Sequence, residues 1–570
     1  MPRIAIDPVT RIEGHLRIEA EVDGGRVADA WSSGTMFRGM EIILRGKDPR
    51  EAWIWAQRIC GVCTTVHALA SVRAVEDALN VEVPDNARLI RTLIAAAQLV
   101  QDHVIHFYHL HALDWVDVTS ALQADPNAAA QLAQSISTWP NNSASNFKAV
   151  QDRVRALVDS GQLSLFTSGY WGHPAYRLPP EANLMAVAHY LDALEWQRDV
   201  IRIHAVLGGK NPHPQTYLVG GMAASLDPNE PGAPLNLERV SFIRERIKTA
   251  RAFVEQVYVP DVLAVAGFYP DWFGIGEGLG NFLAYGGYPS GSIRDPGSYF
   301  IPRGIVLNRD LSQVQPFSQD QIAEYVTHSW YDYSDGDNAA RHPYDGETNP
   351  HYTGPTPPFQ QLQTDQKYSW LKAPRYQGRA MEVGPLARML VAYAAGHQQV
   401  KQLVDGTLAK LNAGPQALFS TLGRVAARAI ESQLIVGQMD GWLTELENNL
   451  GRGRLQVHNG ARWDPASWPR TAQGWGPHEA PRGSLAHWVQ IEDRKIKNYQ
   501  AVVPSTWNAG PRDAQGQRGA YEAALLNTPV ADPERPIEIL RTVHSFDPCL
   551  ACAVHVVDAR GRRYAEVQVV

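Results

Sequence analysis

The sequence predicts a mainly α-helical protein with small β additions, an α+β fold in which a large helical bundle forms the core. Long stretches carry apolar residues at spacings of three and four, the period of a helix that buries one face. Alternating residues predict an N-terminal hairpin and a small C-terminal sheet. Because no internal repeat, low-complexity tract or linker interrupts these patterns, we expect a single body.

The first predicted elements are strands over residues 3–31. Within residues 15–22 apolar side chains alternate with polar ones, as in a half-buried strand, and an Asp-Gly-Gly turn follows. Asp48 and Pro49 then predict a helix start, with the acid at the N-cap and proline at the first helical position. This helix would lead directly to the first pair of cysteines.

A long helix is predicted from Asp85, as its cap, to about Leu113, with a length of roughly 40 Å. Its histidines, His103, His106 and His109, suggest a metal site, but helical spacing spreads them over different faces and favours buried, hydrogen-bonded side chains. The other predicted helices span residues 65–80, 144–159, 180–206, 235–265, 383–412, 415–450, 519–528 and 534–544.

Two regions depart from this helical pattern. Residues 270–375 are rich in Gly, Tyr, Pro and Asp and predict a long irregular excursion with short strands. Residues 474–508 hold a dense motif, His-Glu-Ala-Pro-Arg-Gly from His478, followed by strand patterns over 487–492 and 496–503. We expect this second region to carry functional side chains.

The composition excludes several functional classes. Of the 570 residues, 44% are apolar and 19% are charged, as in ordinary globular proteins. The net charge of −7 argues against a nucleic-acid partner, which requires a basic surface. No apolar run reaches the roughly 18 residues of a membrane span, and Asp7 comes too early for a signal peptide. We therefore expect a soluble chain without a membrane span or address of its own.

All four cysteines fall into two C-x-x-C pairs, Cys60 with Cys63 and Cys549 with Cys552, which lie almost the whole chain apart. Four thiolates suit nickel, zinc or iron better than magnesium or calcium. A structural zinc site and a redox-active dithiol are the simpler alternatives, but zinc knots usually take their pairs from one short segment. The spacing alone leaves both these alternatives and a catalytic metal open.

The residues that flank the cysteines resemble a known family. Arg-Ile-Cys-Gly-Val-Cys around Cys60 and Asp-Pro-Cys-Leu-Ala-Cys-Ala-Val-His around Cys549 resemble the two nickel-binding signatures of the large subunit of nickel–iron hydrogenases. The resemblance is to the group 1 membrane-bound uptake type and runs from Glu13 to His555. It implies the large-subunit fold, one mature domain over residues 1–555, and the heterolytic splitting of hydrogen into protons and electrons.

The resemblance implies nickel on all four sulfurs. Cys60 and Cys549 would be terminal ligands, while Cys63 and Cys552 would also bridge to an iron that carries carbonyl and cyanide ligands. Glu13 would be the first proton acceptor beside a nickel thiolate. Without the resemblance, a surface carboxylate is the simpler interpretation of this glutamate.

Other side chains would surround the open side of the metal site. Asp102, Asp547 and Pro481 would flank it, and Arg482 would hold one cyanide while Ser505 donates to the other. The proton could be handled by a nickel thiolate or by Arg482, but guanidinium pKa values exceed about 12 and favour an electrostatic role. An arginine paired with these acids for structural reasons is the simpler alternative.

A magnesium ion and a maturation step are implied near the C-terminus. Glu41, the backbone carbonyl of Ala501 and His555 would hold the magnesium. A dedicated endopeptidase would then remove residues 556–570, which otherwise permit an ordinary C-terminal strand. Because the tail is charged, it cannot follow His555 into a packed core without unpaired buried charges.

The cysteine count also implies a partner. With all four cysteines committed to nickel, none is left for an iron–sulfur cluster, which normally needs four thiolates. The resemblance supplies a small subunit that carries such clusters, with His213 at the interface, and a membrane cytochrome b as acceptor. It implies co-export to the periplasmic face of the cell membrane. The alternatives are a regulatory hydrogen-sensing subunit and a non-catalytic zinc-binding protein.

Overall fold

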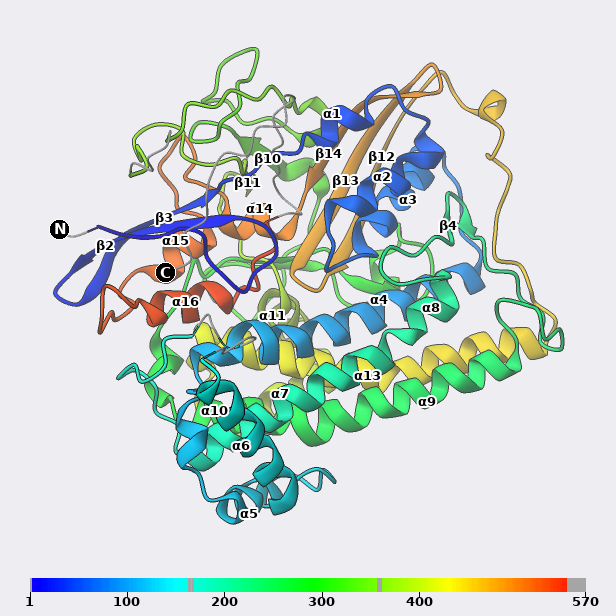
Figure 1. Cartoon of the computed structure of the whole chain (residues 1–570). Coiled ribbons are helices and arrows are strands. Elements are labelled where there is room, and N and C mark those ends of the chain that lie inside the picture. The colour runs from blue at the N-terminus through cyan, green and yellow to red at the C-terminus, as the bar shows by residue number, and fades with distance from the viewer. Residues whose placement is uncertain (1–2, 162–165, 167–168, 356–360, 551–570) are drawn as a thin grey trace.

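The computed structural model describes residues 3–161, 166, 169–355 and 361–550 and confirms the mainly helical α+β class. Four long helices lie side by side and form the core of the bundle (Figure 1). They are α4 (Asp85–Ile105), α7 (Pro180–Val200), α9 (Leu237–Phe253) and α13 (Thr421–Gly451). Nearly all of α4 is buried, as expected of a helix that neighbouring helices surround.

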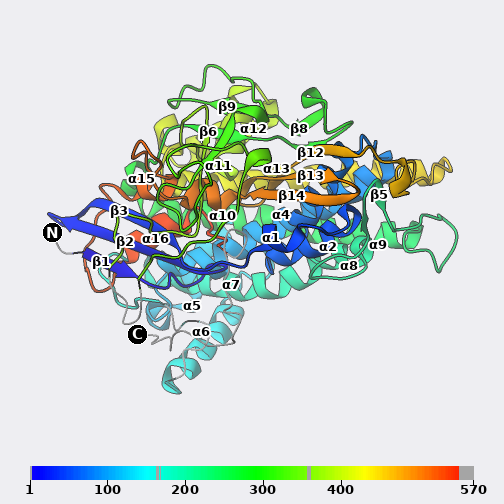
Figure 2. The same cartoon turned by 90° about the horizontal axis from the view of Figure 1, so that it is seen from above.

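Shorter helices surround this core, and α5 and α6 project from one side of the body (Figure 2). In the described part of the chain these helices are α1 (Met40–Leu44), α2 (Ala52–Ala56), α3 (Val66–Ala78), α5 (Pro126–Ile136), α6 (Ala144–Asp159), α8 (Arg202–Gly208), α10 (Val259–Gly267), α11 (Pro385–Ala394), α12 (Gln398–Lys410), α14 (Pro504–Ala509), α15 (Ala520–Leu525) and α16 (Ile537–His544). The sequence did not predict α1, α5 or α14.

The described chain also contains two three-stranded antiparallel sheets. The N-terminal sheet has the order β1 (Arg3–Ile6), β2 (Leu16–Asp23), β3 (Arg26–Gly34), and the C-terminal sheet has the order β12 (Thr471–Ala480), β13 (Gly483–Glu492), β14 (Lys495–Val502). Within the irregular region, short pairs join β6 (Phe282–Ala284) to β9 (Gly304–Val306), β7 (Gly287–Pro289) to β8 (Tyr299–Ile301) and β10 (Ile322–Tyr325) to β11 (Ala373–Tyr376). One further pair joins β4 (Tyr217–Leu218) to β5 (Gly221–Met222).

In the C-terminal sheet the His-Glu-Ala motif precedes β13 and β14 as predicted, but it also ends a further strand, β12, that the sequence did not predict. Glycines make this strand hard to recognise, yet they are what lets α3 lie on the sheet. A Cβ atom on Gly476 would come within 2.0 Å of the Ala70 backbone oxygen, and one on Gly474 within 2.2 Å of the Ala74 oxygen. Pro481 and Arg482 form the tight turn into β13.

Two predicted helices also differ in the structure. Asp85 is the first residue of α4 rather than its cap; the cap position belongs to Pro84, and the helix passes into a wider π-turn after Ile105. The predicted helix over 383–412 is two helices, α11 and α12, separated around Gly396, whose φ of 80° an L-residue adopts only with strain. Asp48 caps its helix as predicted, its side chain accepting from the Arg50 N–H.

Among the residues that the structure describes, no helix combines the length and the apolar character needed to cross a bilayer.

Candidate metal centre

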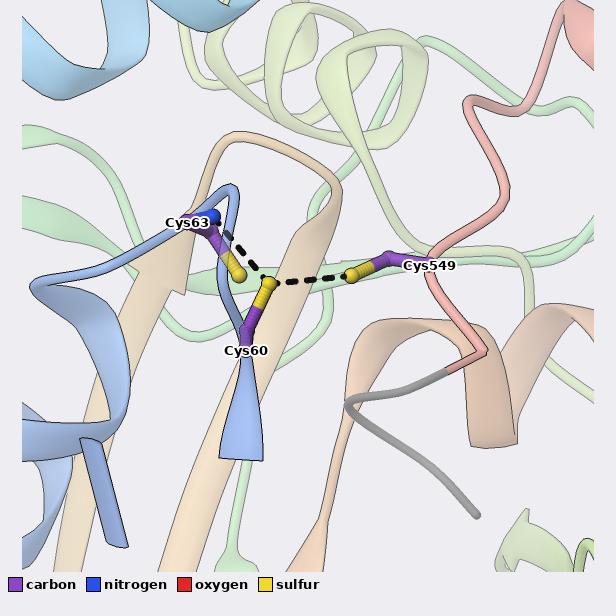
Figure 3. A group of neighbouring side chains, drawn as sticks. All are labelled: Cys60, Cys63 and Cys549. Atoms are coloured by element: carbon purple, nitrogen blue, oxygen red, sulfur yellow. Dashed lines mark hydrogen bonds between the residues drawn. The ribbon is translucent and has the colours of Figure 1, made fainter. Parts of the chain in front are cut away.

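Three cysteine side chains from the two ends of the chain converge in the interior (Figure 3). Cys60 follows the helical turns after α2, Cys63 lies one turn further, and Cys549 lies in the extended segment after α16. Their sulfur atoms all lie within 4.8 Å of one another, and Cys60 Sγ is 3.5 Å from Cys549 Sγ. The predicted convergence is therefore present for these three residues, whereas Cys552 lies outside the described residues.

The cluster fits a soft metal ion. All three thiols are buried among apolar neighbours, where a thiolate needs a cation or hydrogen-bond donors. Cys60 Sγ accepts the backbone N–H groups of Val62 at 3.3 Å and of Cys63 at 3.1 Å, which favours its ionised form. A set of sulfur donors in this environment suits nickel or iron and does not suit a hard cation.

Glu13 lies in the loop between β1 and β2 and contacts the cysteine cluster. The Cys549 thiol donates to Glu13 Oε2 at 3.3 Å, and the two residues form a short parallel bridge in which Leu550 N–H donates to the Glu13 carbonyl at 2.6 Å. Glu13 is thus not a plain surface carboxylate, as the simpler interpretation held. It lies where a proton acceptor for the Cys549 sulfur should be.

Arg482 lies among the acids that were predicted with it. Its Nη2 is 3.0 Å from Asp547 Oδ1, its Nη1 is 3.5 Å from Asp102 Oδ2, and its Nε donates to the Asp547 carbonyl at 3.1 Å. Burial opposes its charged form, but Asp547, Cys549 and Asp102 outweigh burial and raise the pKa of Arg482 above its ordinary value. Burial raises the pKa of both Asp102 and Asp547.

A small pocket opens beside the cysteines, lined by Cys63, Pro481, Arg482, Leu485, Ser505 and Cys549. Ser505 Oγ accepts the Cys549 backbone N–H at 3.0 Å. The predicted residues Pro481, Arg482 and Ser505 therefore share one cavity with two cysteines. Leu485 gives that cavity an apolar wall.

Glu41 and Ala501 also lie together as predicted. Glu41 Oε1 accepts the Ala501 N–H at 3.0 Å, and its Oε2 accepts from Thr348. The sequence did not identify Lys372, whose Nζ lies 3.9 Å from Glu41 and 3.7 Å from Glu324. Burial raises the pKa of Glu324 to about 7.

His555, the third expected ligand of the magnesium, lies outside the described residues, as does the tail over 556–570. Two other site residues escaped the sequence reasoning. Gln98 Nε2–H donates to Asp102 Oδ1 at 2.6 Å, and its spacing of one helical turn from Asp102 could have indicated it. His67 also lines the pocket, four residues after Cys63.

The histidines of α4 and the turn after it are separate, hydrogen-bonded side chains. His103 pairs with Glu431 at 2.8 Å, while the Nε2 atoms of His106 and His109 lie 2.6 and 3.1 Å from the backbone carbonyls of His544 and Tyr190. The expected hydrogen-bonded histidines are therefore present, and among the described residues the cysteines are the group that could hold a metal.

Comparison with known proteins shows that this chain is similar to nickel-dependent hydrogenases. A family model described as nickel-dependent hydrogenase matches residues 38–555, and a HoxL-like model matches residues 3–33. The chain is 52% identical to the uptake hydrogenase large subunit of Bradyrhizobium diazoefficiens, and 49% identical to the hydrogenase-1 large chain of Escherichia coli K12. Both alignments cover 100% of this chain and 97% of the relative.

A solved structure gives the same result. The nickel–iron–selenium hydrogenase of Desulfovibrio vulgaris Hildenborough in the reduced state superposes with a TM-score of 0.75 and 36% identity. The superposition covers 97% of this chain and 100% of that chain.

Proposed function

The chain belongs to the nickel-dependent hydrogenase family, and from that premise we propose how its residues serve the splitting of hydrogen. It is the catalytic large subunit of a nickel–iron hydrogenase, and its metals are nickel and iron. The observation that carries the proposal is the position of Cys549, whose sulfur is 3.5 Å from Cys60 Sγ and 3.3 Å from Glu13 Oε2. The Cys549 sulfur, a proposed metal ligand, therefore lies next to a possible proton acceptor, Glu13 Oε2.

We assign nickel to Cys60, Cys63, Cys549 and Cys552, with Cys63 and Cys552 also holding an iron that carries carbonyl and cyanide ligands. When bound, this centre supplies the Lewis acid that polarises hydrogen and the acceptor for its electrons. The apolar surroundings of the three described cysteines exclude water from the site and strengthen each electrostatic contact within it. The family replaces the zinc interpretation, and relatives named uptake hydrogenase favour catalysis over hydrogen sensing.

Arg482 has an electrostatic and positioning role in this proposal. Asp547, Cys549 and Asp102 raise the pKa of Arg482 although burial opposes its charged form, so Arg482 keeps its proton and is a poor base for hydrogen. Its guanidinium holds Asp102 and Asp547 apart and presents donors to the pocket, where it would bind one cyanide. Ser505, which lines the same pocket, would donate its hydroxyl to the other, and Pro481 closes the turn.

Glu13 carries the proton away from the cysteine. The Cys549 S–H bond breaks and an O–H bond forms on Glu13 Oε2, across a contact of 3.3 Å that exists in the resting arrangement. A carboxylate within reach of a thiol can accept its proton, which a guanidinium with a pKa above about 12 does not. Glu13 is therefore the first step of the path from the metal centre to solvent.

The variant Glu13→Gln tests this role. Glutamine keeps the size of the side chain but cannot accept a proton, so hydrogen–deuterium exchange should collapse by about 10²- to 10⁴-fold while nickel and iron content stay unchanged. The matched control is Glu21→Gln, which alters a carboxylate on β2 that lies at the far end of the strand. Unchanged exchange in Glu13→Gln would transfer the relay role to Arg482 or to water.

We further propose a magnesium ion near Glu41, with the Ala501 carbonyl and His555 as its other protein ligands. Glu41 Oε1 accepts the Ala501 N–H at 3.0 Å, so its carboxylate lies beside this backbone, and magnesium prefers such oxygen ligands. Residues 556–570 would be cut off after His555 once nickel is in place. Leu550 is already fully buried, so charged tail residues could not follow the chain inward without unpaired buried charges.

Intact mass of the large subunit tests this maturation step. The active enzyme should contain a chain that ends at His555, whereas protein made without nickel should retain Val570, because loading precedes the cut. An active enzyme that retains Val570 would refute the proposal. Activity and mass must therefore be measured on the same preparation.

As a hydrogenase large subunit, the chain forms a heterodimer, and we propose that its iron–sulfur small subunit docks beside the first cysteine pair. Exposed apolar side chains mark interaction sites. Those near this pair on α1, α2 and the cysteine loop are Ile42, Ile43, Ile54, Trp55 and Val62. His213 would lie at this interface. We place the mature complex peripherally at the periplasmic face of the cell membrane, passing electrons to a cytochrome b.

A further inference from the structure

The contact between Glu13 and Cys549 joins two segments that lack regular structure. Glu13 lies in the loop between β1 and β2, and Cys549 lies in the extended segment after α16. Each segment contains a left-handed residue two positions earlier, with φ of 54° at Arg11 and 57° at Asp547. Such backbone conformations persist in residues other than glycine only where surrounding contacts hold them.

Asp114 contacts the Glu13 loop and the last residue of α16, from which the Cys549 segment continues. It lies in the helical turn Ala112–Asp114, beyond the end of α4. One of its carboxylate oxygens accepts from Arg11 Nη2, and the other accepts from His544 Nδ1 at 2.6 Å. Arg11 also donates to the Leu110 carbonyl at 2.6 Å, and His544 Nε2 lies 2.9 Å from the Thr10 carbonyl. The last residue of α16 is thereby tied to the Glu13 loop twice.

The carboxylate of Asp114 is the centre of this group. Both ring nitrogens of His544 face oxygen atoms, with Nδ1 2.6 Å from Asp114 Oδ2 and Nε2 2.9 Å from the Thr10 carbonyl. Asp114 is fully buried; burial alone would raise its pKa, but Arg11 and His544 outweigh burial and lower it. One carboxylate thus holds both a guanidinium and an imidazole, and removing it leaves the buried Arg11 guanidinium without its counter-charge.

We propose that Asp114 is a positioning residue for hydrogen oxidation, which holds the Glu13 loop and the Cys549 segment in register. It keeps Cys549 Sγ and Glu13 Oε2 within reach of one another without touching either atom. The inference rests on the proposed role of Glu13 as proton acceptor. Asp114 itself neither gains nor loses a proton in the transfer, in which one S–H bond breaks and one O–H bond forms.

The test is Asp114→Asn in the purified heterodimer. A misplacement of about 1 Å costs about 10²-fold, so hydrogen–deuterium exchange per nickel should fall by about 10- to 100-fold. Proton transfer should then limit turnover, and the solvent isotope effect on kcat should rise above that of the unaltered enzyme. A purely stabilising role for Asp114 would lower the yield or Tm but leave both quantities unchanged.

Asp261→Asn is the matched control. Asp261 on α10 is equally buried and pairs with His189 at 2.7 Å, so its loss should reduce Tm without changing exchange per nickel. Arg11→Lys weakens the contact between residue 11 and Asp114. This variant takes the place of Asp114→Asn in the test if Asp114→Asn does not fold. Suppose that Asp114→Asn and Arg11→Lys show normal exchange and a normal isotope effect while Glu13→Gln blocks exchange. This result would refute the positioning role of Asp114 but not the relay role of Glu13. Normal exchange in Glu13→Gln would refute the relay and this inference with it.

Discussion

Replacement of Cys549 by serine is expected to abolish hydrogen oxidation and to remove nickel from the large subunit. The Cys549 sulfur lies within contact of both Cys60 Sγ and Glu13 Oε2, so one atom serves the metal cluster and the proton acceptor. A serine hydroxyl stays protonated near neutral pH and is a poor ligand for a soft metal. Elemental analysis for nickel and hydrogen-dependent dye reduction should both fall to background in the purified heterodimer.

Ser545→Ala is the control for this variant. Ser545 lies four residues before Cys549 and is equally buried, but its hydroxyl donates to the Thr542 carbonyl at 2.6 Å and supplies no ligand, so nickel and activity should be retained. Cys549→Ser with normal nickel and normal hydrogen oxidation would contradict the assignment of Cys549 as a nickel ligand. If activity were lost but nickel content stayed normal, Cys549 would be needed for the proton transfer and not for binding nickel.

The metal site could be predicted from sequence because its residues fall into short, distinctive motifs. Every cysteine lies in one of two C-x-x-C pairs, and Arg482, Asp547 and Ser505 lie within a few residues of a recognisable stretch. Glu13 has no such signal of its own, and only the family resemblance assigned it a role. The helical bundle was predictable for a similar reason, since the three-and-four spacing of α4 and α13 is local in sequence.

The remaining features depend on contacts between distant segments. Asp114 and His544 are 430 positions apart, and nothing in the local sequence of either indicates a partner. Lys372 and Thr348 lie in the irregular excursion, where no periodicity places a side chain near Glu41. Strand β12 escaped prediction because glycine and proline usually argue against a strand, whereas here the glycines let α3 approach the sheet.

Arg482→Lys is expected to lower turnover by about 10²- to 10³-fold, the usual cost of removing a preorganised donor from an active site. Lysine keeps the positive charge between Asp102 and Asp547, so these buried acids remain compensated and nickel content should be normal. An ammonium group is a compact point charge and cannot make the three contacts of the guanidinium fork with Asp547 and Asp102. Because hydrogen is nonpolar, kcat should fall with little change in KM.

The same variant decides whether Arg482 acts as a base. Lysine has an ordinary pKa of about 10.4, below that of arginine, and would release a proton more readily. If Arg482 took the proton from hydrogen, Arg482→Lys would keep or exceed the activity of the unaltered enzyme. Arg375→Lys is the matched control, since Arg375 is equally buried and pairs with Asp513 at 2.6 Å, outside the pocket beside the cysteines. A fall in kcat for Arg482→Lys alone, with nickel retained in both variants, would establish that the fork geometry rather than proton release is what Arg482 contributes.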